Sequence, residues 1–335
     1  MADFQAAGVM LTRSLAGKER LLGPDHAETL ATVHNLGSMY YKLADYVSAR
    51  SMFQRALNGR DVTLGSHHSS TLSSVHCMAN LHMSCNEFDL ALQYSSRAIA
   101  GRKEVLGPLH ADTLTSINNR GILLFRMGRY EEAKECFDQA MQGRAISIGT
   151  DHPEYFNTLN NYGILELKLG NPQAALQLFQ TACQGRLLKL GSNHQSVFNT
   201  LVNVGDALRC MKEFEASRIE LDKAYHGLHK KLGSQHANTL TAAHHLGQLH
   251  RDSGCFVDAE TYLRLALTGR EAKFGLDHID TLSSMHALGV LYQLQGEKEA
   301  AIAMLKDVLA RRSALLGGTN IDTMETAKLL ESLNC

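Results

Sequence analysis

A short loop signature returns along this chain at a fixed interval, and this periodicity constrains the fold more than any other feature. Each copy reads Gly-x-x-His, and successive copies stand 42 residues apart. The seven pairs are Gly23/His26, Gly65/His68, Gly107/His110, Gly149/His152, Gly191/His194, Gly233/His236 and Gly275/His278. A fixed period of this size is typical of a solenoid, in which one supersecondary unit repeats and packs on its neighbours.

Each unit between two loops predicts a pair of helices. Apolar or small residues recur at helical spacing in two successive sets. In the first unit the sets are Leu30, Val33, Leu36, Gly37 and Tyr40, then Tyr46, Ala49, Phe53 and Ala56. Between the helices stand Gly128, Gly170, Gly254 and Gly296, with Ala44, Asn86 and Lys212 at the equivalent place in other units. Glycine past a helix end supplies the left-handed cap. No strand pattern appears, so we expect an all-α, right-handed α-solenoid of antiparallel helix pairs.

The repeat divides the chain into one elongated domain with a half-unit at each end. We expect a lone helix over residues 1–22, seven complete units over 23–316, and a half-unit over 317–335. A solenoid needs polar faces at its ends. Two interpretations are therefore open: the lone helices cap the array, or the chain is a piece of a longer array. Apolar residues on the lone helices also predict end-to-end self-association. These residues are Met10, Leu11, Leu15, Leu329, Leu330 and Leu333.

Composition argues against several classes of partner. The formal net charge is −1 at pH 7, so no global field attracts nucleic acid or an anionic membrane. No apolar run reaches the roughly 18 residues that a membrane helix needs, and the first 22 residues lack a secretory leader pattern. The 7 cysteines are odd in number and show no paired spacing, which is typical of reduced cytosolic thiols. We therefore expect a cytoplasmic protein.

Small residues at two fixed positions carry a family resemblance. The first helix of each unit holds Gly37, Ala79, Gly121, Gly163, Gly205, Gly247 or Gly289. About a dozen positions later stand Ala49, Ala91, Ala133, Ala175, Ala259 and Ala301, with Ser217 as the one substitution. This pattern resembles the tetratricopeptide repeat. The 42-residue period, the Leu-Gly-x-x-His loop and the Asn-Asn pair in the first helix resemble its kinesin light chain subtype, also seen in nephrocystin-like arrays. The resemblance implies a non-enzymatic adaptor that holds a peptide segment of a partner in a concave groove.

A row of amide side chains lies on the first-helix face opposite the packing face. At about 100° per residue, this face is repeated in every unit and lines the concave surface. The row consists of Asn35, Asn119, Asn161 and Asn203, with His245 at the same position. An Asn amide both donates and accepts, so such a row can pair with the backbone of an extended peptide. The alternative is that these amides brace neighbouring helices within the array.

Basic side chains lie farther along the same face. They are Lys42, Arg126, Lys168, Arg209 and Arg251, and in our sequence assignment only Asp206 and Asp252 oppose them. This local excess of positive charge favours an acidic peptide or a free carboxylate as the ligand. The alternative is a set of solvated helix ends, since cations near helix C-termini suit the macrodipole.

The remaining polar residues predict structure rather than chemistry. Loop histidines in successive units lie about two helix diameters apart, too far to share a metal ion, so we expect no metal site and no cofactor. No catalytic constellation can be assigned, and no enzyme is expected. The Gly-Arg pairs late in the second helices, such as Gly59 and Arg60, predict close approach of the next unit and an arginine that reaches a neighbouring carbonyl or carboxylate. Two other functions stay open: an architectural subunit of a cytoskeletal or ciliary assembly, and a peptide-sensing regulatory solenoid.

Overall fold

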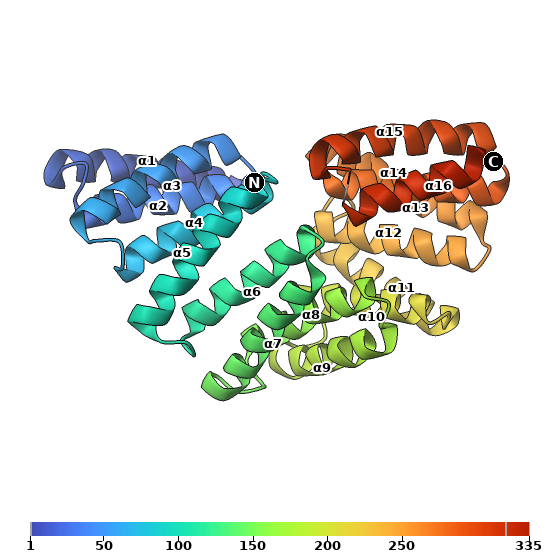
Figure 1. The fold of residues 1–335 in the computed structure, drawn as a ribbon, viewed down its shortest axis with the longest axis horizontal. Coiled ribbons are helices and arrows are strands. Elements are labelled where there is room, and N and C mark those ends of the chain that lie inside the picture. Colours follow the sequence, from blue (N-terminus) through green and yellow to red (C-terminus); the bar gives the residue numbers. More distant parts are fainter. Residues whose placement is uncertain (1, 319, 335) are drawn as a thin grey trace. The chain divides into compact units, whose positions relative to one another are not determined.

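The computed structural model describes residues 2–318 and 320–334, and within them it contains 16 helices and no strand (Figure 1). The first helices of the pairs are α2 (Ala27–Lys42), α4 (Ser69–Ser84), α6 (Ala111–Arg126), α8 (Pro153–Lys168), α10 (Gln195–Cys210), α12 (Ala237–Asp252), α14 (Ile279–Gln295) and α16 (Ile321–Asn334). The second helices are α1 (Ala2–Leu22), α3 (Tyr46–Thr63), α5 (Phe88–Leu106), α7 (Tyr130–Ser147), α9 (Pro172–Leu190), α11 (Phe214–Leu232), α13 (Phe256–Phe274) and α15 (Lys298–Leu316). The predicted all-α fold of consecutive helix pairs is confirmed.

The chain forms two compact units, Met1–Gly149 and Thr150–Cys335. Unit 1 holds α1 to α7 and unit 2 holds α8 to α16. Within each unit, every helix packs on the next helix along the chain, and first helices of adjacent pairs also touch. This order of contacts is that of a solenoid, in which each pair buries its apolar faces only against its neighbours.

Small residues allow the two helices of a pair to approach closely. The alanines predicted for this contact, from Ala49 to Ala301, are fully buried. A Cβ atom added at Gly121 would lie 2.7 Å from the ring of Phe137, which is closer than packed atoms come. Ser217, which replaces the alanine in α11, is buried and donates a hydrogen bond of 2.7 Å to the carbonyl of Gly205. The small-residue pattern is therefore set by helix packing.

The loop histidines cap the helices that follow them. In all seven loops the Nδ1 atom accepts a hydrogen bond from the backbone N–H two residues later, at 3.2 to 3.3 Å. This bond satisfies one of the N–H groups that a helix start leaves unpaired. It requires a neutral imidazole with the proton on Nε2. The predicted structural role of these histidines is confirmed.

The turns between paired helices need a left-handed backbone. Gly128 has φ 76° and Gly254 has φ 82° at these positions. Ala44, Asn86 and Lys212 adopt the same conformation with φ 60°, 59° and 63°. Side chains rarely tolerate this region, so these three residues carry a conformational cost that glycine avoids.

Buried arginines tie three consecutive helices together. Arg270 of α13 donates to the carbonyl of Asp280 at 2.9 Å and to the hydroxyl of Ser284 at 2.8 Å. That hydroxyl lies 3.4 Å from Nδ1 of His244 on α12. The same arrangement links Arg60, Ser74 and His34; Arg102, Ser116 and His76; and Arg312, Thr326 and His286. The predicted reach of the arginine toward a neighbouring carbonyl is confirmed.

Burial sets the charge of the histidines in these braces. Burial, with a smaller contribution from the adjacent arginine of each brace, lowers the pKa of His34, His76 and His286 to about 4. These imidazoles are therefore neutral near pH 7, and those of His34 and His76 can each accept a hydrogen bond from the hydroxyl of the adjacent serine.

The last helix is better covered than its sequence suggests. Leu330 and Leu333 are only 5% and 7% exposed, because they pack into a core cluster with residues of α13, α14 and α15. The expectation that this half-unit presents both leucines to an outside partner is therefore wrong. In α1, by contrast, Met10 is 72% exposed.

Candidate functional site

In unit 1, the structure places the two asparagines of the amide row in different surroundings. Asn35 is exposed on α2. Asn119 is half-buried on α6, and its amide donates to Oδ1 of Asn80 at 3.1 Å and lies 3.4 Å from Nε2 of His76. Both of these partners belong to α4. Asn119 therefore braces adjacent first helices, as the alternative interpretation expected for this row.

In unit 2, the amide row continues on α8, α10 and α12. Asn161 is half-buried on α8. Asn203 donates to Oδ1 of Asn160 at 2.8 Å and so links α10 to α8. Nδ1 of His245 lies 3.2 Å from Oδ1 of Asp206, which is ion-pair distance, although the two atoms are not aligned as a hydrogen bond. Any ligand contact of this row stays a prediction.

In unit 1, only part of the basic row is available to an acidic ligand. Lys42 is exposed at the end of α2. Arg126 donates to the carbonyl of Met83 and to Oδ1 of Asn86, both at 3.1 Å, and its guanidinium lies 6.0 Å from the ring centre of Phe88. Arg126 thus satisfies backbone and side-chain acceptors at the end of the preceding first helix.

In unit 2, carboxylates face all three cations of the basic row. Arg209 forms ion pairs with Asp206 at 2.8 Å and with Asp252. Arg251 lies 2.7 Å from Asp252. The local excess of positive charge is therefore smaller than the sequence indicated, because the set of acidic residues assigned to this face from the sequence was incomplete.

The missing partners belong to the last helix. Nζ of Lys168 lies 2.8 Å from Oδ1 of Asp322 and 3.4 Å from Oε1 of Glu325. These residues follow Lys168 by 154 and 157 positions. The 42-residue repeat describes how each pair meets the next, but it carries no direct signal for a contact across four pairs.

Neighbouring charges keep Asp206 ionised despite its burial. Burial alone would raise its pKa, but His245 and Arg209 outweigh that effect and hold the pKa well below the usual value. Asp206 in turn helps to raise the pKa of Arg209. The side chains of both residues are about 15% exposed (16% and 14%), so this pair forms a fixed charged floor on the first-helix face.

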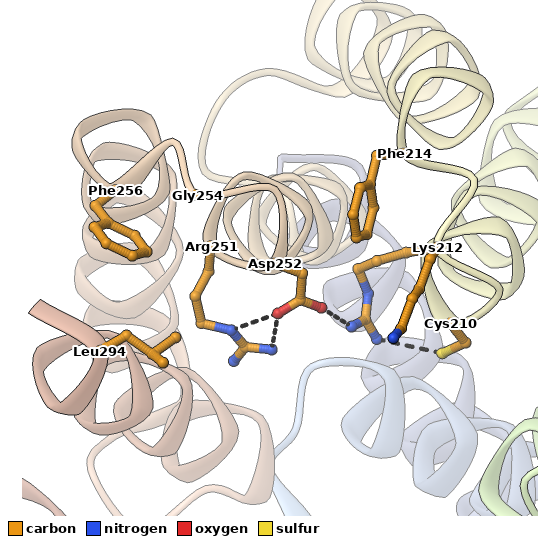
Figure 2. Close-up of a pocket in the computed structure, with 9 residues that line it drawn as sticks. Cys210, Lys212, Phe214, Arg251, Asp252, Gly254, Phe256 and Leu294 are labelled. Carbon is orange, nitrogen blue, oxygen red and sulfur yellow. Dashed lines mark hydrogen bonds and ion pairs between the residues drawn. The ribbon is translucent and has the colours of Figure 1, made fainter.

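A pocket of about 550 Å³ opens beside this floor (Figure 2). It lies where α10 and α12 end, where α11 and α13 begin, and near the end of α14. Two phenylalanine rings and a leucine give it apolar walls, and three cations and one carboxylate give it polar ones. The lining residues are Arg209, Cys210, Lys212, Phe214, Arg251, Asp252, Gly254, Phe256 and Leu294.

Lys212 is the cation of this pocket that sequence analysis did not select. Its side chain is exposed, and no carboxylate among the described residues forms an ion pair with it. The backbone holds Lys212 at φ 63°, where four other units have glycine. Its charge at a position that favours glycine was the sequence signal that could have identified it. Phe214, Phe256 and Leu294 were also not selected, because aromatic and apolar residues near helix ends read as packing.

The described residues show neither a cluster of metal-binding side chains nor a helix that could span a membrane. They contain no group of three or more His, Cys, Asp or Glu side chains able to hold a metal ion. No helix among them combines the length and apolarity required to cross a membrane. What the pocket can do chemically is bind: it can pair an anionic group with Lys212 and cover an apolar group with Phe256 and Leu294.

Comparisons with known proteins give a family and a fold. The family model for the tetratricopeptide repeat matches residues 1–61, 70–145, 112–187, 196–272 and 244–314. No curated protein is similar enough in sequence to match.

Several solved structures share the fold. The Rap conjugation gene regulator of plasmid pLS20, solved with the Phr* peptide, is 16% identical with a TM-score of 0.69, covering 89% of this chain and 76% of its own. The apo form of RapI is 14% identical with a TM-score of 0.65, covering 84% and 97%. BtubC (BKLC) from P. vanneervenii is 16% identical with a TM-score of 0.58, covering 69% and 92%. At these identities the likeness shows the fold alone.

Proposed function

Because the chain belongs to the tetratricopeptide repeat family, we propose that it is a non-enzymatic scaffold that binds a peptide segment of a partner protein along the exposed face of its first helices. The structure of the Rap regulator with a bound peptide supports this type of ligand for the fold. The 42-residue spacing of the helix starts and the Leu-Gly-x-x-His loop support an adaptor of the kinesin light chain subtype.

The observation that carries the proposal is the pocket of unit 2. Its volume of about 550 Å³ suits a few side chains of a peptide rather than a whole domain. Lys212 has an unpaired ammonium there, and Arg251 has five N–H donors, of which those on Nε and Nη2 face Asp252. The ligand is a segment that brings a carboxylate to Lys212 and Arg251 and an apolar side chain to Phe256.

Reversing the charge of Lys212 tests this function. The Lys212→Glu chain and the wild-type chain are immobilised, and proteins recovered from cell extract are quantified by mass spectrometry. The matched control is Lys230→Glu, which makes the same charge change at an exposed position of α11 outside the pocket. A genuine partner is captured by the wild-type and control chains and lost from the Lys212→Glu chain.

Affinity then gives the quantitative check. Loss of one charge-assisted contact of about 1.5–3 kcal/mol weakens binding by at least tenfold. Equal binding of an identified partner by all three chains would exclude the pocket. Binding that depends instead on the second helices would favour the architectural subunit of a cytoskeletal or ciliary assembly.

We also propose that the protein is cytoplasmic and that it self-associates through its N-terminal helix. The six described cysteines are all free thiols, which supports a reducing compartment. Exposed apolar residues of α1, among them Val9 and Met10, support self-association through the N-terminal helix. Sedimentation over a range of concentrations tests it, and a monomer at tens of micromolar would argue against it.

A further inference from the structure

Ion pairs connect the first and last helices of unit 2. Lys168, at the end of α8, contacts Asp322 and Glu325 in the first turns of α16. Neither helix relies on the other for its packing, since α8 packs on α9 and α10 while α16 packs on α15. The link between them is therefore made by charged side chains that can separate without exposing a core.

This link lies close to the cations of the candidate site. Lys168, Asp322 and Arg251 all influence the ionisation of the same half-buried imidazole, that of His286 on α14. Arg251 also lines the pocket. The carboxylates of α16 consequently stand in the part of unit 2 where an acidic ligand would meet the basic row.

Asp322 and Glu325 are spaced so that both of their carboxylates reach the ammonium group of Lys168. Asp322 and Glu325 are three residues apart on a helix, so they project from the same face and present two negative groups to one ammonium. Their side chains and that of Lys168 are 31%, 54% and 27% exposed. Water reaches the ion pairs, so they are weak and exchange readily with other anions.

We propose that Asp322 and Glu325 form an intramolecular clasp on Lys168, and that this clasp competes with an acidic ligand for the basic row of unit 2. The competition rests on the binding function proposed above, whereas the clasp itself does not. Separation of α16 from Lys168 removes two carboxylates from the basic row, so a bound acidic segment and a closed clasp exclude each other.

The clasp is tested first without any ligand. The full chain is treated with a limiting amount of sulfo-NHS-acetate, and acetylation of Lys168 is followed by mass spectrometry with Lys230 as the internal reference. In the Asp322→Asn/Glu325→Gln variant we expect Lys168 to react several times faster than in the wild-type chain. The control is Glu299→Gln/Glu331→Gln, which removes two exposed charges from α15 and α16 outside the ion pairs. Equal rates at Lys168 in all three chains would overturn the clasp.

The competition is tested with fluorescein-labelled decaglutamate and fluorescence anisotropy. Removing the two carboxylates should tighten binding about fivefold, the ratio expected for loss of weak exposed ion pairs. The control variant should bind like the wild-type chain, and Lys168→Gln should bind more weakly than either. Circular dichroism confirms that α16 stays folded, because Asp322 also lies in its first turn.

The two experiments separate the possible failures. Faster acetylation with unchanged decaglutamate affinity means that the clasp exists but does not compete, which overturns the proposal. If no variant binds decaglutamate, the acidic-ligand part of the proposed function fails and the competition fails with it, while the acetylation rates still decide whether the clasp forms.

Discussion

Replacing Ser284 by alanine should weaken unit 2 locally, because this hydroxyl joins three helices. Ser284 is fully buried, accepts a 2.8 Å hydrogen bond from Arg270 and lies 3.4 Å from Nδ1 of His244. A hydrogen bond to a charged group contributes about 1.5–3 kcal/mol, and the gain in helix propensity from serine to alanine returns up to about 0.5 kcal/mol. The expected net loss is about 2 kcal/mol.

The control for this change is the adjacent residue of the same helix. Ser283 is half-buried, and its hydroxyl bonds only to the carbonyl of Ile279 within α14, at 2.9 Å. Ser283→Ala therefore makes the same chemical change without touching the brace. We expect its effect on stability to stay within about 0.5 kcal/mol.

Hydrogen exchange is the suitable assay, since solenoids open locally and a single unfolding free energy is poorly defined for them. Peptides from α12 and α14 should exchange about 30-fold faster in Ser284→Ala than in the wild-type chain, which corresponds to about 2 kcal/mol. Ser283→Ala should exchange within about twofold of the wild-type chain. Equal exchange in the two variants would refute the brace as a stabilising element.

Three further outcomes follow from buried or strained groups. Folding lowers the pKa of His34, His76 and His286 from 6.5 to about 4, so between these pH values the unfolded chain binds more protons than the folded chain. The contribution of these histidines to stability is therefore full above pH 6.5 and falls as the pH drops toward 4. Melting curves recorded by circular dichroism should show this decrease. Ala175→Leu overpacks a fully buried helix contact and should cost about 1–3 kcal/mol, so an unchanged melting temperature would contradict the packing. Lys212→Gly should raise stability by about 1 kcal/mol by relieving φ 63°, measured as a higher melting temperature, while it weakens binding at the pocket.

The sequence predicted the features that depend on neighbouring pairs. A structural role for loop histidines such as His110 and the reach of Arg60 to the next first helix were both predicted, because both contacts recur in the same register in successive pairs. The capping bond itself was found only in the structure. The contact of Lys168 with Asp322 was missed because it depends on how curvature accumulates over four pairs, which no single period encodes. Leu330 was assigned to an open face because sequence alone does not tell how far α15 and α14 cover the last helix.

The Asn row shows the same limit at closer range. Periodicity assigned Asn119 to the first-helix face opposite the packing face, and in the structure it lies half-buried beside the preceding first helix. It could not tell whether the amide would point to a ligand or to Asn80, because that choice depends on side-chain rotamers and on the distance between α4 and α6. Lys212 was missed for a similar reason, since the pocket beside it is completed by Phe256 and Leu294, which belong to other pairs.

The arginine brace has a consequence for how such a chain can change length. Each brace spans fixed offsets, from Arg102 to the carbonyl of Asp112 and the hydroxyl of Ser116, and from Arg312 to Asp322 and Thr326. Duplication or deletion of one whole unit by recombination would bring a donor from one copy to matching acceptors of another. An insertion of any other length would separate them. The array can therefore gain or lose only whole repeat units if the hydrogen bonds between neighbouring units are to be kept.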